Sequence, residues 1–382
     1  MPRTTVKSDE VEDVLTRIRL IRTRLVISSA LLLVAGLIVF AGVPYVCRLQ
    51  DGFASSQRLV GTYQVLDPAT FDLGEPTEID AHRETTVDSA TQSTALVTST
   101  TVVNLPSGAQ STKYSYAVNR YDYGQIRPPK GGDVLNQRGG MVISRPTASG
   151  AGDFKVYNPA IDSTQPMTYT GSSQIGGRAV NNFTGTASGV LADRQLAAPY
   201  EAAIGVLANT GDGTTIPKLL LEMIVADLPL RYAGRLAAIL PALPNEVSVK
   251  LTVVDTTSLA LDQQIGAPIT LSGDQTTILN VFDDFTLTPV MPLSRIALHS
   301  DADSTAASAQ YMSDNGRKLT MFGTYLPIGL TAAALALAIS VAVSVVRFRR
   351  SSTPVASATA ASDPDPGDRH TTRYTRAGAA LP

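Results

Sequence analysis

Two long runs without a charged residue lie near the ends of the chain, and polar and charged residues are concentrated between them. The first run extends from Leu25 to Cys47 and the second from Leu319 to Val346. At about 1.5 Å of rise per residue, a helix of either run can cross a hydrocarbon core of roughly 30 Å. The pattern therefore predicts transmembrane helices at residues 25–47 and 319–346.

Each run also has an alternative interpretation. A cleaved signal peptide would place an apolar run near the N-terminus, but this run is longer than a signal-peptide core and Pro44-Tyr-Val-Cys lacks a small-residue cleavage site. A buried helix of a soluble domain is the alternative for the second run. Its length without a charge favours a membrane span.

Arginine residues flank both runs on the sides that face the chain ends. They are Arg17, Arg19, Arg22 and Arg24 before the first run and Arg347, Arg349 and Arg350 after the second. Arginine clusters favour the cytoplasmic side, which outweighs Arg317 and Lys318 on the opposite flank. We therefore expect a multi-pass protein of the inner (plasma) membrane with both termini cytoplasmic. Residues 1–24 are then a cytoplasmic segment, residues 48–318 an extracytoplasmic domain, and residues 347–382 a disordered cytoplasmic tail.

The extracytoplasmic domain has mainly the pattern of β-strands. Residues 95–103 and 113–118 predict a hairpin, and Val247, Val249, Leu251 and Val253 alternate with polar residues. Shorter candidates lie at residues 269–271, 276–282 and 295–298, with turns expected at Gly273-Asp274 and Asp283-Asp284. An antiparallel sheet or open barrel is expected, in which the first and last parts of the domain pair.

A helical segment interrupts this β pattern. Residues 191–208 and 217–243 are rich in Ala, Leu and Ile, and they predict about three short helices broken at residues 211–213, at Pro229 and at residues 241–244. The chain is thus predicted to be an α+β membrane protein. Two transmembrane helices flank a mainly antiparallel β ectodomain with an α-helical insertion at about residues 191–243.

Charge and cysteine content narrow the possible functions. Acidic residues outnumber basic ones in residues 48–318, which argues against nucleic-acid binding. The single cysteine, Cys47, excludes a disulfide within the extracytoplasmic domain.

Residue patterns of known chemistry are missing from the sequence. The three histidines are far apart, and we find no zinc-ligand spacing, nucleophile elbow or phosphate-binding glycine loop. The carboxylate pairs, such as Asp283-Asp284, lack the alternating ligands of a calcium loop. The sequence predicts no enzyme, no metal site and no cofactor.

Apolar residues of the helical insertion are the candidates for lipid binding. They are Leu219, Leu220, Met223, Ile224, Leu228, Leu236, Ile239 and Leu240. They are more apolar than a surface helix requires, so they either line a cavity for a lipid chain or pack against the sheet as core. Arg120, Tyr121 and Tyr123 are candidates for a lipid headgroup or sugar, with a packed strand end as the alternative.

Several motifs resemble a known family. They are residues 118–124 (VNRYDYG), 140–146 (GMVISRP), 176–180 (GGRAV), 265–268 (IGAP) and 274–277 (DQTT). With the two terminal spans, they resemble actinobacterial two-pass membrane proteins of unknown function labelled porin PorA-like. Asn119 stands where the family pattern has Asp, and no established chemistry attaches to these motifs.

The label "porin" implies an outer-membrane barrel, whereas helices this hydrophobic are retained in the inner membrane. The arrangement also has a distant architectural resemblance to CD36-class receptors, which hold a β-rich domain with a helical head between two spans. We therefore expect a non-enzymatic envelope protein that binds or passes lipid or glycolipid. The alternative is a scaffolding or accessory subunit that contacts another envelope membrane protein.

Overall fold

A computed structural model describes residues 8–127, 133–147, 149–210 and 213–351. The predicted disordered tail beyond residue 351 and the predicted helix break at Gly211 and Asp212 lie outside the described residues. The chain divides into two compact units, one formed by residues 1–31 and 332–382 and the other by residues 32–331.

Both uncharged runs are helical, as predicted. The N-terminal helical segments are α1 (Ser8–Leu37), a π-helical turn (Ile38–Gly42) and α2 (Val43–Cys47). The C-terminal ones are α6 (Ala302–Thr320), a π-helical turn (Met321–Tyr325) and α7 (Leu326–Ser351). The stretches Leu15–Cys47 and Ala302–Phe348 are each long and apolar enough to cross a membrane. The second helical stretch begins at Ala302, well before the predicted span at residue 319.

Within the first unit, α1 and α7 lie side by side. The Ser28 hydroxyl donates a hydrogen bond of 2.8 Å to the Ala334 carbonyl, and Arg24 Nη1 donates one of 2.7 Å to Ser340 Oγ. These two hydrogen bonds link α1 to α7 within the first unit.

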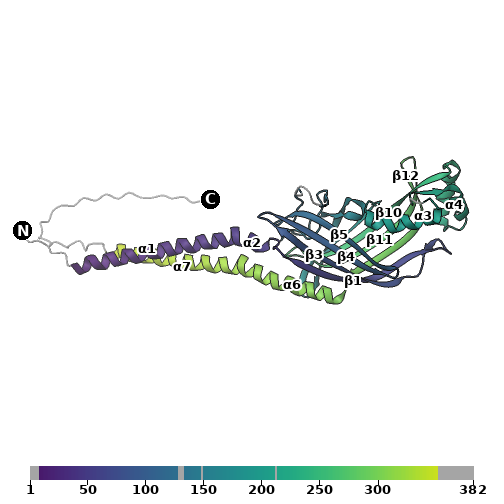
Figure 1. Cartoon of the computed structure of the whole chain (residues 1–382). Helices are drawn as coiled ribbons and strands as arrows, with labels where there is room; N and C mark the ends of the chain where they lie inside the picture. The colour runs from purple at the N-terminus through teal and green to yellow at the C-terminus, as the bar shows by residue number, and fades with distance from the viewer. Residues whose placement is uncertain (1–7, 128–132, 148, 211–212, 352–382) are drawn as a thin grey trace, which may run out of the picture. The chain divides into compact units, whose positions relative to one another are not determined.

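The second unit contains a large antiparallel sheet that curves into a half-barrel (Figure 1). Its strands are β1 (Ala54–Asp67), β2 (Asp72–Leu73), β3 (Thr77–Ala90), β4 (Thr94–Leu105), β5 (Gly108–Asn119), β6 (Phe154–Asn158), β7 (Ser163–Ile175), β8 (Arg178–Val190), β9 (Thr215–Pro217), β10 (Glu246–Asp262), β11 (Pro268–Asp283) and β12 (Thr286–Ser300). The main order is β5-β4-β3-β1-β12-β11-β10-β8-β7-β6, with β2 paired to β1 and β9 to β10.

The predicted pairing of the first and last strands is confirmed. β1 and β12 pair from Leu59 opposite Ser300 to Val65 opposite Ser294. The predicted hairpin is β4 and β5, and the predicted turn at Asp283-Asp284 joins β11 to β12, with Asp284 at φ 45°.

The predicted turn at Gly273-Asp274 is wrong. Both residues lie inside β11, which merges the two short candidates at residues 269–271 and 276–282 into one strand. Asp274 pairs with Thr256 of β10, and its carboxylate binds Arg295 on the neighbouring β12. Turn-forming residues were overridden here by pairing with strands on both sides.

The insertion contains three α-helices, as predicted. They are α3 (Arg194–Ala208), α4 (Lys218–Ile224) and α5 (Leu230–Ile239), followed by a 3-10 turn (Leu240–Ala242). The short strand β9, which the sequence did not predict, lies between α3 and α4. We call α3, α4 and α5 the cap. The cap packs on the inner face of the sheet, where Leu221 and Leu236 are fully buried against Val253 and Leu279.

The outer face of the sheet is covered in part by α6. Ala309 and Met312 of α6 pack against Val180, Ala260 and Ile269. These sheet residues alternate with inward-facing neighbours such as Phe183 and Leu261, as the period of two requires. The two faces are therefore assigned by side-chain contacts as well as by register.

Candidate ligand site inside the half-barrel

The two edges of the sheet are joined by a segment that is not itself a strand of the sheet. The Leu135 amide donates to the Ser115 carbonyl of β5, and Gln137 Nε2 donates to the Ala117 carbonyl. A few residues later, the Met141 amide donates to the Lys155 carbonyl of β6. Residues 135–141, which we call the closing segment, therefore bridge β5 to β6.

Side chains from opposite edges also meet. The Tyr114 hydroxyl of β5 donates a hydrogen bond to the Asp193 carboxylate, which caps the first turn of α3. The Tyr116 ring of β5 lies edge-on to the Tyr157 ring of β6, with 6.3 Å between centroids. The half-barrel thus encloses an interior along the β5–β6 seam.

The hairpin of β6 and β7 bends onto the inner face of β8. A Cβ added at Gly185 would lie 2.3 Å from the Pro166 carbonyl oxygen, so the two backbones can approach this closely because Gly185 has no side chain. Gln165 is fully buried there, and its Nε2 donates to the Gly185 carbonyl at 2.7 Å. The hairpin is therefore one wall of the interior.

Apolar clusters occupy both ends of this interior. The cap cluster, described above, closes one end. At the other end Leu49, which follows α2, packs with Val87, Val97, Val118 and Tyr123. We call this group the stem cluster. The polar side chains described next therefore have an apolar cluster on either side.

Between the two apolar clusters, many of the inward-facing side chains are polar and partly accessible. Seven inward-facing polar side chains of β1, β3, β4, β10 and β11 keep part of their accessible surface: Gln57, Arg83, Thr85, Thr101, Asp255, Thr257 and Gln275. In a close-packed core, inward-facing side chains lose nearly all of their accessible surface. These seven side chains are therefore not sealed from solvent.

Arg83 is the positively charged residue among these seven side chains. It lies on β3 opposite Gln57 of β1 and Thr101 of β4. Burial lowers the pKa of the Arg83 guanidinium, with a smaller opposing effect from Tyr116. The group is therefore enclosed by protein although its surface stays partly accessible.

Asp255 lies on the same inner face, on β10. Its Oδ2 accepts a hydrogen bond of 2.7 Å from Asn158 Nδ2. Burial raises the pKa of the Asp255 carboxyl to about 6, against the opposing effect of the Asn158 hydrogen bond. Asp255 can therefore change its charge near neutral pH.

The eight apolar candidates from the cap do not share one environment. Leu228, Leu236 and Leu240 are buried in the cap cluster, and Leu220, Ile224 and Ile239 are partly buried against it. Leu219 and Met223 are exposed, at 67% and 64%. Their predicted role in lining a lipid cavity is not tested by these positions and stays a prediction.

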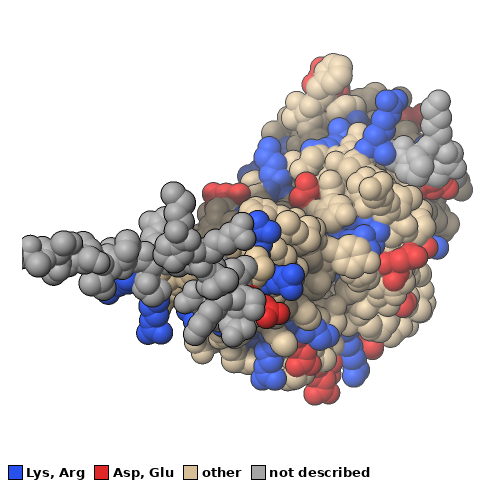
Figure 2. All heavy atoms as spheres, turned by 90° about the vertical axis from the view of Figure 1, so that its left-hand side faces the viewer, with Lys and Arg blue, Asp and Glu red and all other residues tan. Residues whose placement is uncertain are grey.

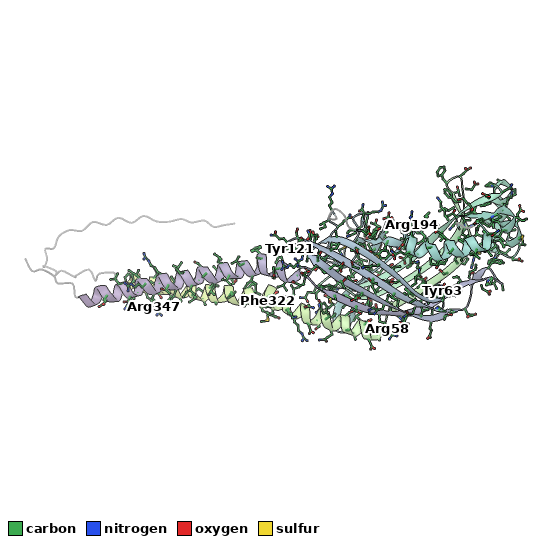
Figure 3. All side chains as sticks on the ribbon, viewed as in Figure 1. Arg58, Tyr63, Tyr121, Arg194, Phe322 and Arg347 are labelled. Carbon is green, nitrogen blue, oxygen red and sulfur yellow. The ribbon has the colours of Figure 1, made fainter. Side chains whose placement is uncertain are left out.

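The three headgroup candidates lie where the sheet meets the end of the first helical stretch. Arg120 is buried, and its Nε and Nη1 donate to the carbonyls of Leu49 and Thr91 at 2.7 and 2.5 Å. The Tyr123 hydroxyl donates to the Cys47 carbonyl at 2.8 Å. Tyr121, labelled in Figure 3, is 40% exposed. These contacts anchor the chain after α2, and a role in headgroup binding stays a prediction.

Other kinds of site find little support in the described part of the chain. Among the described residues, no three His, Cys, Asp or Glu side chains gather in a group that could hold a metal ion. On the face shown in Figure 2, acidic and basic side chains are interspersed rather than gathered in a patch of one sign. A basic face for nucleic acid is not visible there.

Sequence reasoning did not identify Arg83 or Asp255. The signal for Arg83 was an arginine at an inward position of an alternating strand, between Ala81 and Thr85. Finding it required recognising β3 as a strand and knowing which of its faces points inward. Neither the strand nor its inward face can be predicted from a sequence in which both faces carry several polar residues.

Comparisons with known proteins identify the family. The chain matches the family described as Porin PorA over residues 23–343, which include the sheet, the cap and most of both apolar helices. The comparison with curated proteins found no match. A solved structure described as the dehydratase domain of RzxB from Pseudomonas fluorescens is 10% identical, with a TM-score of 0.10, and the match covers 66% of this chain and 78% of that chain. That similarity supports no inference about fold or activity. The family match and the two apolar helices indicate a membrane protein of the cell envelope, and the chain belongs to the porin PorA family.

Proposed function

We propose that the protein binds a membrane lipid or glycolipid inside the half-barrel, without catalysing a reaction on it. The observation that carries the proposal is the set of partly accessible, inward-facing polar side chains between two apolar clusters. An amphiphilic lipid matches this arrangement, because its polar group needs hydrogen bonds and its chains need apolar contacts.

The proposal includes an orientation in the membrane. The two apolar helices would cross the inner membrane and leave residues 48–318 on the extracytoplasmic side, because arginines flank both spans on the side of the chain ends. Reporters fused to either terminus should then be cytoplasmic. A terminus found outside the cell would contradict this orientation.

A pair of substitutions on β4 tests whether the interior holds the lipid. Thr101 faces inward and keeps partial exposure, whereas its neighbour Thr100 faces the outer side. Thr101→Trp should fill part of the interior and reduce the lipid that co-purifies with the protein, measured by native mass spectrometry. Thr100→Trp adds the same ring on the other face and should leave the bound lipid unchanged.

Thermal unfolding of both variants separates a filled interior from a damaged fold. If the interior has room, Thr101→Trp keeps a melting transition close to that of the unsubstituted protein. A folded Thr101→Trp variant with its full lipid content would contradict binding inside the half-barrel, as would an unsubstituted protein that carries no lipid.

A second candidate function is that of an accessory subunit of an envelope complex. It is favoured by exposed apolar side chains on the cap, among them Leu207 at 68%, Leu219 at 67% and Leu230 at 94%. The same native mass spectra test this candidate, because a bound partner adds the mass of a protein rather than that of a lipid.

A further inference from the structure

Arg83 uses few of its hydrogen-bond donors within the protein. A guanidinium has five N–H groups, and here Nε donates to Ser99 Oγ at 3.3 Å. Among the described residues, no carboxylate lies within ion-pair distance of Arg83. Neither terminal nitrogen belongs to the buried atoms that lack a partner, so both reach accessible space in the interior.

Tyr116 supplies a second donor near Arg83. Arg83 reaches Ser99 of β4, and Tyr116 of β5 lies opposite Val97, the next inward-facing residue of that strand. Its ring is buried against Tyr157, but its hydroxyl has no hydrogen-bond partner among the described residues and is not sealed from solvent. Burial raises the pKa of Tyr116 to about 12; Arg83 lowers this pKa, and Asp193 raises it further. The phenol therefore stays protonated and can donate a hydrogen bond.

Asp193 is the acidic group near this pair. Its Oδ2 accepts from the Tyr114 hydroxyl and its Oδ1 from the Gln195 amide at the start of α3. Its charge is thus already engaged by a helix N-terminus and by a phenol. Apart from the bond from Arg83 Nε to Ser99, the donors of Arg83 and Tyr116 have no acceptor among the described residues.

A charged group inside a protein is costly unless an opposite charge or several hydrogen bonds compensate it. Water can supply some of these bonds where the side chains are accessible, and an anion can supply the charge as well. Guanidinium groups match phosphate and carboxylate oxygens with two parallel hydrogen bonds. The arrangement therefore favours an anionic ligand over a neutral one.

We propose that Arg83 and Tyr116 form the binding site for an anionic group, a phosphate or a carboxylate, at the head of the bound lipid. This inference rests on the proposed function and narrows its ligand to anionic amphiphiles. The stem cluster and the cap cluster on either side of Arg83 would receive the apolar chains.

Three probes separate the charge of the ligand from its chains. Dioleoyl phosphatidate carries a phosphate and two acyl chains, dioleoylglycerol carries the same chains without the charge, and inorganic phosphate carries the charge alone. The full-length protein is delipidated in detergent, incubated with each probe at equal concentration, and assayed for retained probe by native mass spectrometry.

We expect the protein to retain phosphatidate at least tenfold better than dioleoylglycerol or inorganic phosphate. Arg83→Gln should reduce this preference at least tenfold, and Tyr116→Phe should reduce it less, because a neutral hydrogen bond is weaker than a charged one. The control is Arg58→Gln on the neighbouring β1. Arg58, labelled in Figure 3, is exposed and lies opposite the outward-facing His82 of β3, so its loss should leave phosphatidate retention unchanged.

Circular dichroism and thermal unfolding verify that each variant is folded. If Arg83→Gln does not fold, Arg83→Lys and Tyr116→Phe replace it in the test. Arg83→Lys keeps the charge but loses the paired hydrogen-bond geometry, so it should retain part of the preference for phosphatidate.

Each contrary result has a distinct meaning. Equal retention of phosphatidate and dioleoylglycerol would overturn the anionic site and leave lipid binding intact. An Arg83→Gln variant that keeps the preference would overturn the role of Arg83. Strong retention of inorganic phosphate alone would overturn the lipid as its source, and retention of none of the probes would overturn both proposals.

Discussion

The ion pair of Arg178 and Asp262 offers a sharp test of how the sheet is fixed to α6. The Asp262 carboxylate is fully buried and accepts from Arg178 Nε and Nη2 at 2.7 and 2.9 Å. It also accepts from the backbone amides of Gln264 and Ile265. The side-chain amide Nε2 of Gln264 in turn donates to the Gly316 carbonyl and to Thr320 Oγ1 of α6. One carboxylate thus organises both the turn after β10 and its contact with the helix.

Asp262→Asn removes the charge while nearly preserving the shape. Arg178, whose side chain is 18% exposed, would then be left without its counter-charge. Removing one partner of a buried pair costs about 3 to 5 kcal/mol, because the remaining charge stays in a poorly hydrated place. For a domain of this size, that loss corresponds to a decrease in melting temperature of roughly 6 to 15 °C.

The pair of Arg295 and Asp274 is a matched control. It has the same two-pronged geometry, with distances of 2.9 and 2.6 Å, but its side chains are 45% and 38% exposed. Exposed pairs contribute about 0 to 1 kcal/mol, so Asp274→Asn should lower the melting temperature by no more than about 3 °C. Melting is followed for both variants in the same detergent at neutral pH. If the two variants melt together, burial of the Arg178 pair does not have the energetic role assigned to it.

Three further predictions concern the interior and the cap. The folded-state pKa of Asp255, about 6, lies above its unfolded value, so ionisation of this residue should lower the free energy of unfolding as the pH rises from 4 to 7. Asp255→Asn should therefore raise the free energy of unfolding by on the order of 2 to 3 kcal/mol at pH 7.5. Melting experiments across this pH range should show that the variant has lost the pH dependence. Gly61→Ala would place a Cβ 1.8 Å from the Ala297 carbonyl oxygen, so it should force β1 away from β12 and cost about 1 to 3 kcal/mol in the same measurement. Leu220→Arg should reduce co-purified lipid and keep the melting transition, because Leu220 is partly exposed; Leu236→Arg, at a fully buried position, should lose the transition.

Local sequence pattern was sufficient to predict the elements whose burial is uniform. The two apolar helices could be predicted because a long uncharged run marks such a helix without reference to any other part of the chain. The hairpin of β4 and β5 and the three cap helices were likewise predicted, since the hairpin is rich in Val and Thr and the helices are rich in Ala and Leu. In these elements each local preference agrees with the fold.

The strands that surround the polar interior were harder to predict. Along β3 the inward-facing residues are Ile79, Ala81, Arg83, Thr85 and Val87, so a charged and a polar residue interrupt the apolar face. A strand of this kind does not show the alternation that marks a half-buried sheet. The polar side chains that define the candidate site therefore also interrupt the pattern by which these strands could be recognised.

The candidate residues chosen from sequence were the most conspicuous ones rather than those that face the interior. The dense polar and aromatic stretch at residues 119–124 drew attention to Arg120, which binds two backbone carbonyls. Arg83 stands alone in its segment, and its significance comes from Ser99 and Tyr116 on two other strands. Only long-range pairing brings these side chains together, so local sequence could not reveal them.

The segments that carry the family resemblance are those that close and brace the half-barrel. Residues 118–124 precede the closing segment, and residues 140–146 begin at its end. A Cβ at Gly140 would lie 2.6 Å from the Tyr157 amide nitrogen, where the chain joins β6. A Cβ at Gly266, in a third such segment, would lie 2.4 Å from the Arg145 carbonyl oxygen, and Arg178, in a fourth, holds Asp262. These residues make tight backbone contacts and ion pairs rather than a cluster of reactive groups. The motifs therefore support the fold rather than the proposed anion site, because Arg83 and Tyr116 lie outside all of them.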